Sequence, residues 1–125
     1  VHNEGLPVFE RIVNRGDQHD VDKIVERLPD VTTRKEAREA RTLFQKALIA
    51  GEVDLSNSLR DTRGGTYAKN AYVYWKEANV WVTMKRRSKP NQWEMTTVLL
   101  PDETGRPKWE PKNPNSPYPF VGYCD

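Results

Sequence analysis

The hydrophobic residues change their spacing midway along the chain, and this change constrains the fold more than any other feature. Up to Gly51, apolar residues recur every three or four positions, which is the period of an amphipathic helix. From Ala71 onward, β-branched and aromatic residues form short runs that are typical of strands. Helices followed by strands predict an α+β fold in which the helices pack on one face of a sheet.

Two short helical segments are predicted near the start of the chain. The first covers residues 7–16, because Pro7 suits a first helical turn and Val8, Phe9, Ile12 and Val13 lie on one side before Gly16. The second begins at Asp20 as N-cap and is ended by Pro29. Its apolar stripe consists of Val21, Ile24, Val25 and Leu28.

A third helix carries the clearest signals. Thr33 and Glu36 have the spacing of a capping box, and Gly51 suits the C-cap. One apolar stripe comprises Ala37, Ala40, Leu43, Phe44, Ala47 and Leu48. The other side carries charges of both signs, which we expect to face solvent: Arg34, Lys35, Glu36, Arg38, Glu39 and Arg41.

The second half of the chain contains three runs of strand-forming residues, 71–75, 80–85 and 93–100. The segments between them are short, so the strands are expected to be antiparallel neighbours, and a fourth short strand is predicted near 58–62. The prediction is therefore a four-stranded antiparallel sheet behind the N-terminal helices. Alternation directs Val80, Val82 and Met84 toward the helices and Trp81, Thr83 and Lys85 to the other face.

Residues 101–125 contain six of the nine prolines together with four aromatic residues, Trp109, Tyr118, Phe120 and Tyr123. Disordered tails are usually poor in aromatic residues, so we expect an extended arm that packs back across the domain. A proline-rich ligand segment is the alternative. The chain is thus predicted to form one domain over 1–125, with a helical part (1–51), a sheet (57–100) and the arm (101–125).

Several classes of protein are excluded by what the sequence lacks. Apolar stretches such as Val98–Leu100 are far too short to span a bilayer, and no signal-peptide pattern opens the chain. Cys124 is the single cysteine, so neither a disulfide framework, a disulfide-linked partner nor a Cys-based zinc site is expected. No cofactor-binding motif is present, and we predict no cofactor or metal. Because the sequence starts at Val1, we expect a fragment of a longer protein.

Basic residues are concentrated in the middle of the chain. Residues 57–93 hold eight Lys and Arg against two acidic residues, whereas the segments on either side each carry a net charge of −2. A basic block of this kind favours a polyanionic partner such as RNA. The plainer interpretation is a solvated strand surface on which lysines protect a sheet edge.

The basic block has the residue types that RNA cleavage by 2′-hydroxyl attack requires. Arginine and lysine side chains bind phosphate and stabilise its added negative charge, and Tyr and Thr hydroxyls position the reacting groups. The candidate catalytic residues are Arg60, Arg63, Lys69, Tyr72, Tyr74, Lys85, Thr96 and Thr97. Trp81, Arg86 and Arg87 are candidates for substrate binding. The alternative is that the tyrosines and Trp81 are ordinary core beneath the arm.

His19 is the histidine that could act as a general acid or base. It sits in the segment Asp17-Gln-His-Asp20 at an expected helix start, where a surface or capping role is the more common outcome.

This combination resembles the barnase–EndoU–colicin–RelE group of ribonucleases, over roughly residues 33–100. The resemblance rests on the element order, the run Arg60-Asp-Thr-Arg63, the strand Tyr72-Val-Tyr-Trp75, and Thr96-Thr97 in the last strand. It implies a toxin domain, such as those of contact-dependent growth inhibition or of phages, that enters the target-cell cytoplasm. The barnase and EndoU histidine pattern is absent, so the likeness is to the histidine-poor members of the group, which act on tRNA or on ribosome-bound mRNA. The resemblance therefore implies an RNA substrate, with tRNA as the first choice, and an acidic immunity protein as partner.

Three functional hypotheses follow from the sequence. The first is a metal-independent endoribonuclease toxin domain that cleaves RNA by 2′-hydroxyl transesterification. The second is a non-catalytic nucleic-acid-binding module that uses the same basic face. The third is a protein-interaction domain, either an immunity protein or a phage structural protein, whose interface is the aromatic arm.

Overall fold

The computed structural model describes residues 9, 11–14, 16, 18–55, 58–61, 70–86, 92–108 and 120–123. Within these ranges the elements follow the order β1 (Arg11–Asn14), α1 (His19–Arg27), α2 (Arg34–Ile49), β2 (Leu59–Asp61), β3 (Asn70–Trp75), β4 (Val80–Arg86), β5 (Gln92–Leu99) and β6 (Phe120–Tyr123). The predicted α+β class is confirmed. Of the helices described, neither is long and apolar enough to cross a membrane.

The described strands form one mixed sheet in the order β1-β5-β4-β3-β2-β6. The four strands from β2 to β5 are antiparallel neighbours, as predicted. Two further strands lie at the edges: β1 pairs with β5 in parallel, and β6 pairs with β2 in antiparallel orientation. The expectation of a purely antiparallel sheet is therefore only partly met.

The helix predicted over 7–16 is wrong, because residues Arg11–Asn14 form strand β1. Ile12 packs against the core, and the Gln45 amide of α2 donates a hydrogen bond of 2.6 Å to Asn14 Oδ1. A short segment with the β-branched pair Ile12-Val13 suits a strand as well as a helix. The free edge of β5 offers this segment a row of backbone hydrogen-bond partners, and that favours the strand.

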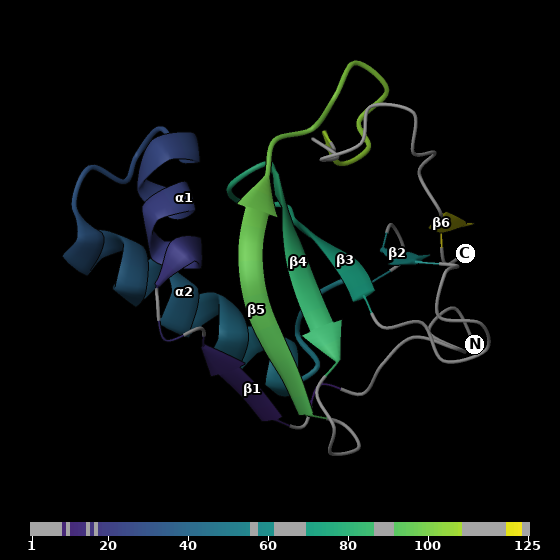
Figure 1. Ribbon diagram of the computed structural model, residues 1–125, viewed down its shortest axis with the longest axis horizontal. Helices are drawn as coiled ribbons and strands as arrows, with labels where there is room; N and C mark the ends of the chain where they lie inside the picture. Colours follow the sequence, from purple (N-terminus) through teal and green to yellow (C-terminus); the bar gives the residue numbers. More distant parts are fainter. Residues whose placement is uncertain are drawn as a thin grey trace.

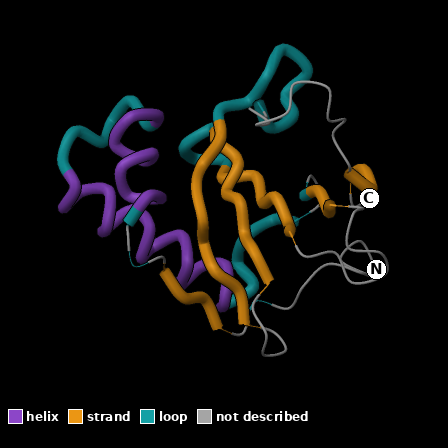
Figure 2. The backbone as a smooth tube through the Cα atoms, viewed as in Figure 1, coloured by secondary structure: helices purple, strands orange, loops and turns teal. Residues whose placement is uncertain are grey.

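Both helices lie on one side of the sheet (Figure 1, Figure 2). Val80, Val82 and Met84 of β4 are completely buried beneath them, which confirms the predicted alternation. The Phe44 ring of α2 lies 4.8 Å from the Trp75 ring of β3, measured between ring centroids. Helices and sheet therefore share the larger of two hydrophobic clusters in the described part of the chain, and this cluster occupies the space between the two layers.

A β-bulge in β5 changes the side-chain alternation of that strand. Thr83 pairs with Thr97 and Met84 pairs with Met95, so Thr96 is an extra residue on the β5 side. As a result Met95 and Val98 both belong to the core beneath the helices, although they are three positions apart. Strict alternation cannot place both residues on one face, and the bulge is the reason that both are buried there.

The start of α1 differs from its prediction. Its N-cap is Gln18, which has a left-handed backbone (φ 55°), and Asp20 lies within the helix. The Asp20 carboxylate is completely buried and pairs with Arg41 Nη1 of α2 at 3.0 Å. Arg41 is thus buried between the helices, and its predicted place on the solvent-facing side is wrong. The reason is the Asp20 carboxylate on the neighbouring helix.

Helix α2 begins as predicted. Thr33 Oγ1 accepts a hydrogen bond of 3.1 Å from the Glu36 backbone N–H, and Gly51 follows the C-cap with φ +76°. Leu43, predicted as part of the apolar stripe, is instead 70% exposed. It lies at the margin of the predicted stripe, and the buried face of α2 is turned toward Arg41 and Gln45 instead.

Two parts of the predicted C-terminal arm are described. Residues 101–108 form a tight loop closed by a bridge between Pro101 and Pro107, and Pro107 is buried. Residues 120–123 return as the edge strand β6. Trp109 and Tyr118, which were predicted to pack on the domain, lie outside the described residues.

Candidate functional site on the outer face of the sheet

The candidate site lies on the sheet face opposite the helices, here called the outer face. Register places three cross-strand rows of side chains on this face. The aromatic row contains Tyr74, Trp81 and Leu99; the hydroxyl row contains Tyr72, Thr83 and Thr97; the charged row contains Asn70, Lys85 and Glu94. Consecutive rows are about 6.6–6.8 Å apart along a strand.

The aromatic row is covered by the loop 101–108. Trp81 is only 2% exposed, and its indole Nε1 donates a hydrogen bond of 3.0 Å to the Gly105 carbonyl. The Tyr74 ring packs on Trp81 with 5.2 Å between centroids, and the Tyr74 hydroxyl bonds to Asn79 Oδ1. Trp81 therefore does not present the exposed ring that stacking on an RNA base needs, and the expectation of core beneath the arm describes it better.

The hydroxyl row lies between the aromatic row, which the loop 101–108 covers, and the charged row, where Lys85 is exposed. Tyr72 is 1% exposed and Thr83 is 8% exposed, whereas Thr97 is half-buried. Thr83 Oγ1 is buried and has no hydrogen-bond partner among the described residues. The neighbouring Thr96 hydroxyl is occupied, since it donates to the Thr83 carbonyl at 3.1 Å across the bulge.

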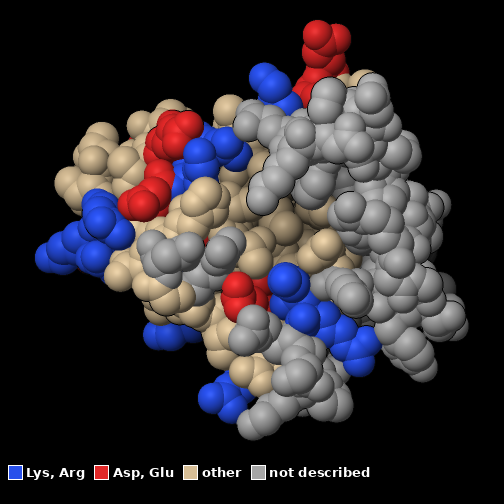
Figure 3. All heavy atoms as spheres, viewed as in Figure 1, with Lys and Arg blue, Asp and Glu red and all other residues tan. Residues whose placement is uncertain are grey.

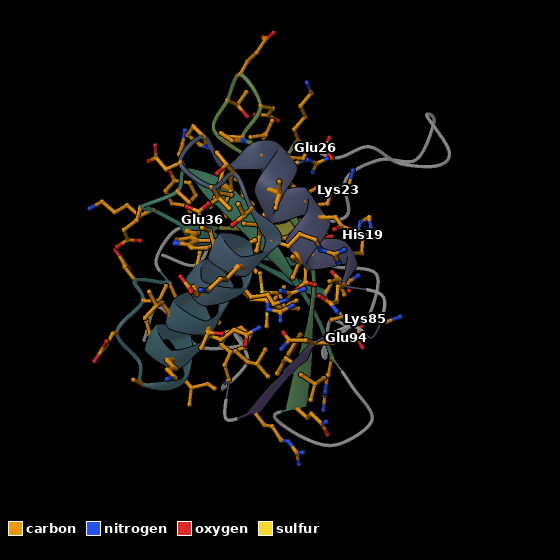
Figure 4. The ribbon with its side chains drawn as sticks, turned by 90° about the vertical axis from the view of Figure 1, so that its left-hand side faces the viewer. His19, Lys23, Glu26, Glu36, Lys85 and Glu94 are labelled. Carbon is orange, nitrogen blue, oxygen red and sulfur yellow. The ribbon has the colours of Figure 1, made fainter. Side chains whose placement is uncertain are left out.

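The charged row is the open end of the outer face. Lys85 is exposed, and among the described residues it has no ion-pair partner. Glu94 is directly opposite Lys85 on β5, and Asn70 is opposite it on β3. The Lys85 and Glu94 labels are adjacent in Figure 4, and basic and acidic side chains lie side by side over the end of β4 in Figure 3. A cation and a carboxylate thus stand next to each other beside threonine hydroxyls.

Several predicted site residues cannot be placed. Arg63, Lys69 and Arg87 lie outside the described residues, and so does the side chain of Arg60, although its backbone belongs to β2. Arg86 is half-buried and pairs with Trp93, which belongs to the core beneath the helices. Arg86 therefore does not share the outer face with Lys85.

Glu94 is the residue that the sequence analysis missed as a functional candidate. It lies between Trp93 and Met95, which are both buried in the core. Alternation alone therefore directs Glu94 to the outer face, and the antiparallel pairing of β4 with β5 places it opposite Lys85. The sequence signal that could have identified Glu94 is its outward position on one strand beside Lys85, which points outward on the neighbouring strand.

Three arginines of the helical layer are engaged in contacts within that layer or with the sheet. Arg27 donates to the Val98 carbonyl at 2.6 Å, Arg34 pairs with Asp22, and Arg38 donates to Gln18. His19 is exposed at the start of α1, alongside Lys23 and Glu26 of the same helix in Figure 4. In the described ranges, no group of three or more His, Cys, Asp or Glu residues is arranged to hold a metal ion.

A cavity of about 430 Å³ lies at the loop 101–108, lined by Pro101, Asp102, Glu103, Thr104 and Lys108. Asp102 Oδ1 accepts hydrogen bonds from the Thr104 hydroxyl (2.6 Å) and backbone N–H (2.8 Å) and from the Arg106 N–H. The Thr104 hydroxyl above all, with these backbone donors, lowers the pKa of Asp102 from its usual value. The Asp102 carboxylate therefore stabilises the conformation of the loop 101–108 through these hydrogen bonds.

Comparison with known proteins gives no relative. No family model, no curated protein and no solved structure matches the chain. The function proposed below is therefore argued from the chemistry of the outer-face residues.

Proposed function

We propose that this chain is an endoribonuclease domain that cleaves RNA by attack of a ribose 2′-hydroxyl on the adjacent phosphate. The observation that carries the proposal is the charged row: exposed Lys85 directly opposite Glu94, next to the threonines of the hydroxyl row. A cation, a carboxylate and hydroxyl groups on one rigid sheet are the groups that this reaction uses.

The proposed reaction assigns one proton transfer to each charged residue. Glu94 accepts the proton of the 2′-hydroxyl while the 2′-oxygen forms a bond to phosphorus. The Lys85 ammonium stabilises the negative charge on the phosphoryl oxygens and gives a proton to the 5′-oxygen as the P–O5′ bond breaks. The products are a 2′,3′-cyclic phosphate and a 5′-hydroxyl, and Glu94 then returns its proton to the neighbouring Lys85.

Binding of the polyanion is supported by the charge of the chain. The segment 57–93, which contains β2 to β4, carries eight basic and two acidic residues. Such a charge excess raises the local concentration of RNA and speeds its association at low salt. The finer assignments remain proposals that rest on the resemblance: a delivered toxin domain, tRNA as substrate, and an acidic immunity protein as partner.

The test is single-turnover cleavage of total tRNA and of unstructured RNA by Lys85→Ala and Glu94→Gln. Each substitution is expected to lower the rate at least about a hundredfold, as for loss of one preorganised catalytic contact. Lys76→Ala and Glu77→Gln are the matched controls, since both residues are exposed in the turn at the opposite end of β4. These controls are expected to cleave RNA at the rate of the unmodified protein.

Three results would contradict the proposal. RNA that is bound with a steep salt dependence but never cut would identify a nucleic-acid-binding module. A protein that neither binds nor cleaves RNA would favour a protein-interaction domain. Cleavage that is abolished by EDTA and restored by Mg²⁺ would exclude the assigned roles of Lys85 and Glu94, because those roles need no metal ion.

A further inference from the structure

Thr83 carries a buried hydroxyl group for which the described part of the chain offers no hydrogen-bond partner. Its Oγ1 atom is inaccessible to solvent, and the residue lies in the middle of β4, the strand between β3 and β5. Leaving a hydroxyl unpaired in the interior costs free energy, and most buried polar groups are paired for that reason. A valine of nearly the same shape would avoid this cost. The presence of the hydroxyl at this position is therefore consistent with a hydrogen-bond partner supplied by a ligand.

The position of Thr83 indicates which kind of partner it lacks. Along β4 it stands between Trp81, beneath the loop 101–108, and Lys85, at the open end of the face. Across the sheet it is flanked by Tyr72 and Thr97. A ligand held by Lys85 would therefore lie next to Thr83, and it would reach the buried hydroxyl only after the neighbouring side chains shift.

We propose that Thr83 binds the ribose 2′-hydroxyl of the nucleotide whose phosphate lies against Lys85, and that it thereby selects RNA over DNA. This assignment rests on the proposed endoribonuclease function. Two hydroxyl groups suit each other because each can donate and accept a hydrogen bond. The 2′-hydroxyl is also the group that distinguishes the two nucleic acids at a single site.

The spacing along β4 fits this assignment. Thr83 and Lys85 are two residues apart on the same face, about 6.6–6.8 Å along the strand, and the flexible lysine stem spans part of that distance. Two further buried polar atoms lack a partner within the described ranges, Arg41 Nε and Ser58 Oγ, and neither has this placement. Arg41 lies between the helices, and Ser58 precedes β2.

The experiment compares ligands that the enzyme cannot cut. The four ribonucleoside 3′-monophosphates and their 2′-deoxy counterparts contain no internal phosphodiester and differ only in the 2′-hydroxyl. Their dissociation constants are measured by NMR titration with the unmodified protein, Thr83→Val and Thr83→Ser. Thr42→Val is the matched control, because Thr42 is exposed on α2 and its hydroxyl bonds only to the Arg38 carbonyl among the described groups.

The unmodified protein and Thr83→Ser are expected to bind a ribonucleotide about five- to tenfold more tightly than its deoxy counterpart, the value of one hydrogen bond. In Thr83→Val the two affinities become equal, while its melting temperature is at least that of the unmodified protein because no unpaired hydroxyl is buried. Cleavage of RNA by Thr83→Val falls by a similar or larger factor. Thr42→Val behaves as the unmodified protein in both assays.

The inference and the proposed function fail in different ways. If the unmodified protein cuts RNA and Thr83→Val keeps both its rate and its ribose preference, the assignment of Thr83 is wrong and the function stands. A lower melting temperature for Thr83→Val would show that the hydroxyl has a structural partner, which also contradicts the assignment. If the unmodified protein neither cuts RNA nor binds any of the nucleotides, both proposals are wrong.

Discussion

Single residues at the start of α2 show how a local contact defines an element. Thr33 Oγ1 accepts the Glu36 backbone N–H, and the Glu36 carboxylate accepts hydrogen bonds from the hydroxyls of Thr32 and Thr33. These two hydroxyls, Thr32 first, lower the pKa of Glu36 from its usual value. The first turn of the helix is thus held by groups that are adjacent in sequence, and such contacts are visible in a sequence.

Replacement of Thr33 tests the cap. Thr33→Ala is expected to lower the free energy of unfolding by about 1 kcal/mol, because the Glu36 N–H loses its partner. Thr42→Ala is the control on the same helix: Thr42 is exposed, and alanine is the better helix former. Urea unfolding measures both. Equal stabilities for the two variants would contradict a capping role.

Asp102 gives a prediction on pH at the same scale. Its pKa is lowered in the folded state, so its contribution to stability is present above pH of about 4, where it is charged in both states, and is lost as the pH falls below that value. Asp102→Asn is therefore expected to be less stable than the unmodified protein at pH 7, with a difference that shrinks toward pH 3. Urea unfolding at several pH values measures this difference. Glu103→Gln in the same loop is the control, and a gap that stays constant with pH would count against the prediction.

At the scale of elements, the two helices are joined by the buried pair of Asp20 and Arg41. The Asp20 carboxylate is completely buried, and both of its oxygens accept hydrogen bonds from Arg41 Nη1. Burial removes both charges from water, so each depends on the other. The pair therefore fixes how α1 lies against α2.

Removal of one member of this pair should be costly. Asp20→Asn leaves the Arg41 charge buried without its counter-charge, and we expect a loss of about 3–5 kcal/mol in the free energy of unfolding. Asp22→Asn is the matched control on α1, since Asp22 pairs with Arg34 at 3.4 Å on the surface and should lose less than about 1 kcal/mol. Similar losses for both variants, measured by guanidinium unfolding, would show that the buried pair has no special weight.

The elements also show what a sequence can predict and what it cannot. Strands β3 to β5 and helix α2 follow from local period, turns and caps, and so does the outward placement of Lys85. Residues 11–14 could not be recognised as a strand, because their partner β5 lies about 80 positions away in the chain. The bulge at Thr96 and the cover over Trp81 likewise depend on contacts between distant segments.

The whole molecule consists of a helical layer, a sheet, and C-terminal segments that return to the sheet. The loop 101–108 contacts the outer face through Trp81, while β6 pairs with β2 at the edge. The helices cover one side of the core, and this loop covers part of the other. Stability and access to the outer face therefore both depend on the C-terminal part of the chain.

Truncation tests that dependence. A chain that ends at Leu100 uncovers Trp81 and Leu99, and exposing two such side chains is expected to lower the free energy of unfolding by about 3–6 kcal/mol. A chain that ends at Lys108 keeps the loop and loses β6, so its loss should be smaller. Urea unfolding compares the three lengths, and equal stabilities would show that the loop does not cover a core.

The strand order has a consequence for how this protein emerges from the ribosome. Strands β3, β4 and β5 follow one another closely in the chain, so they can pair soon after synthesis. The partner of β1, by contrast, is made about 80 residues after it, and β6 is made later still. Pairings between such distant segments form slowly because a long loop must close first. The edges of the sheet should therefore be completed last, and until then β1 remains without its parallel neighbour and open to chaperones.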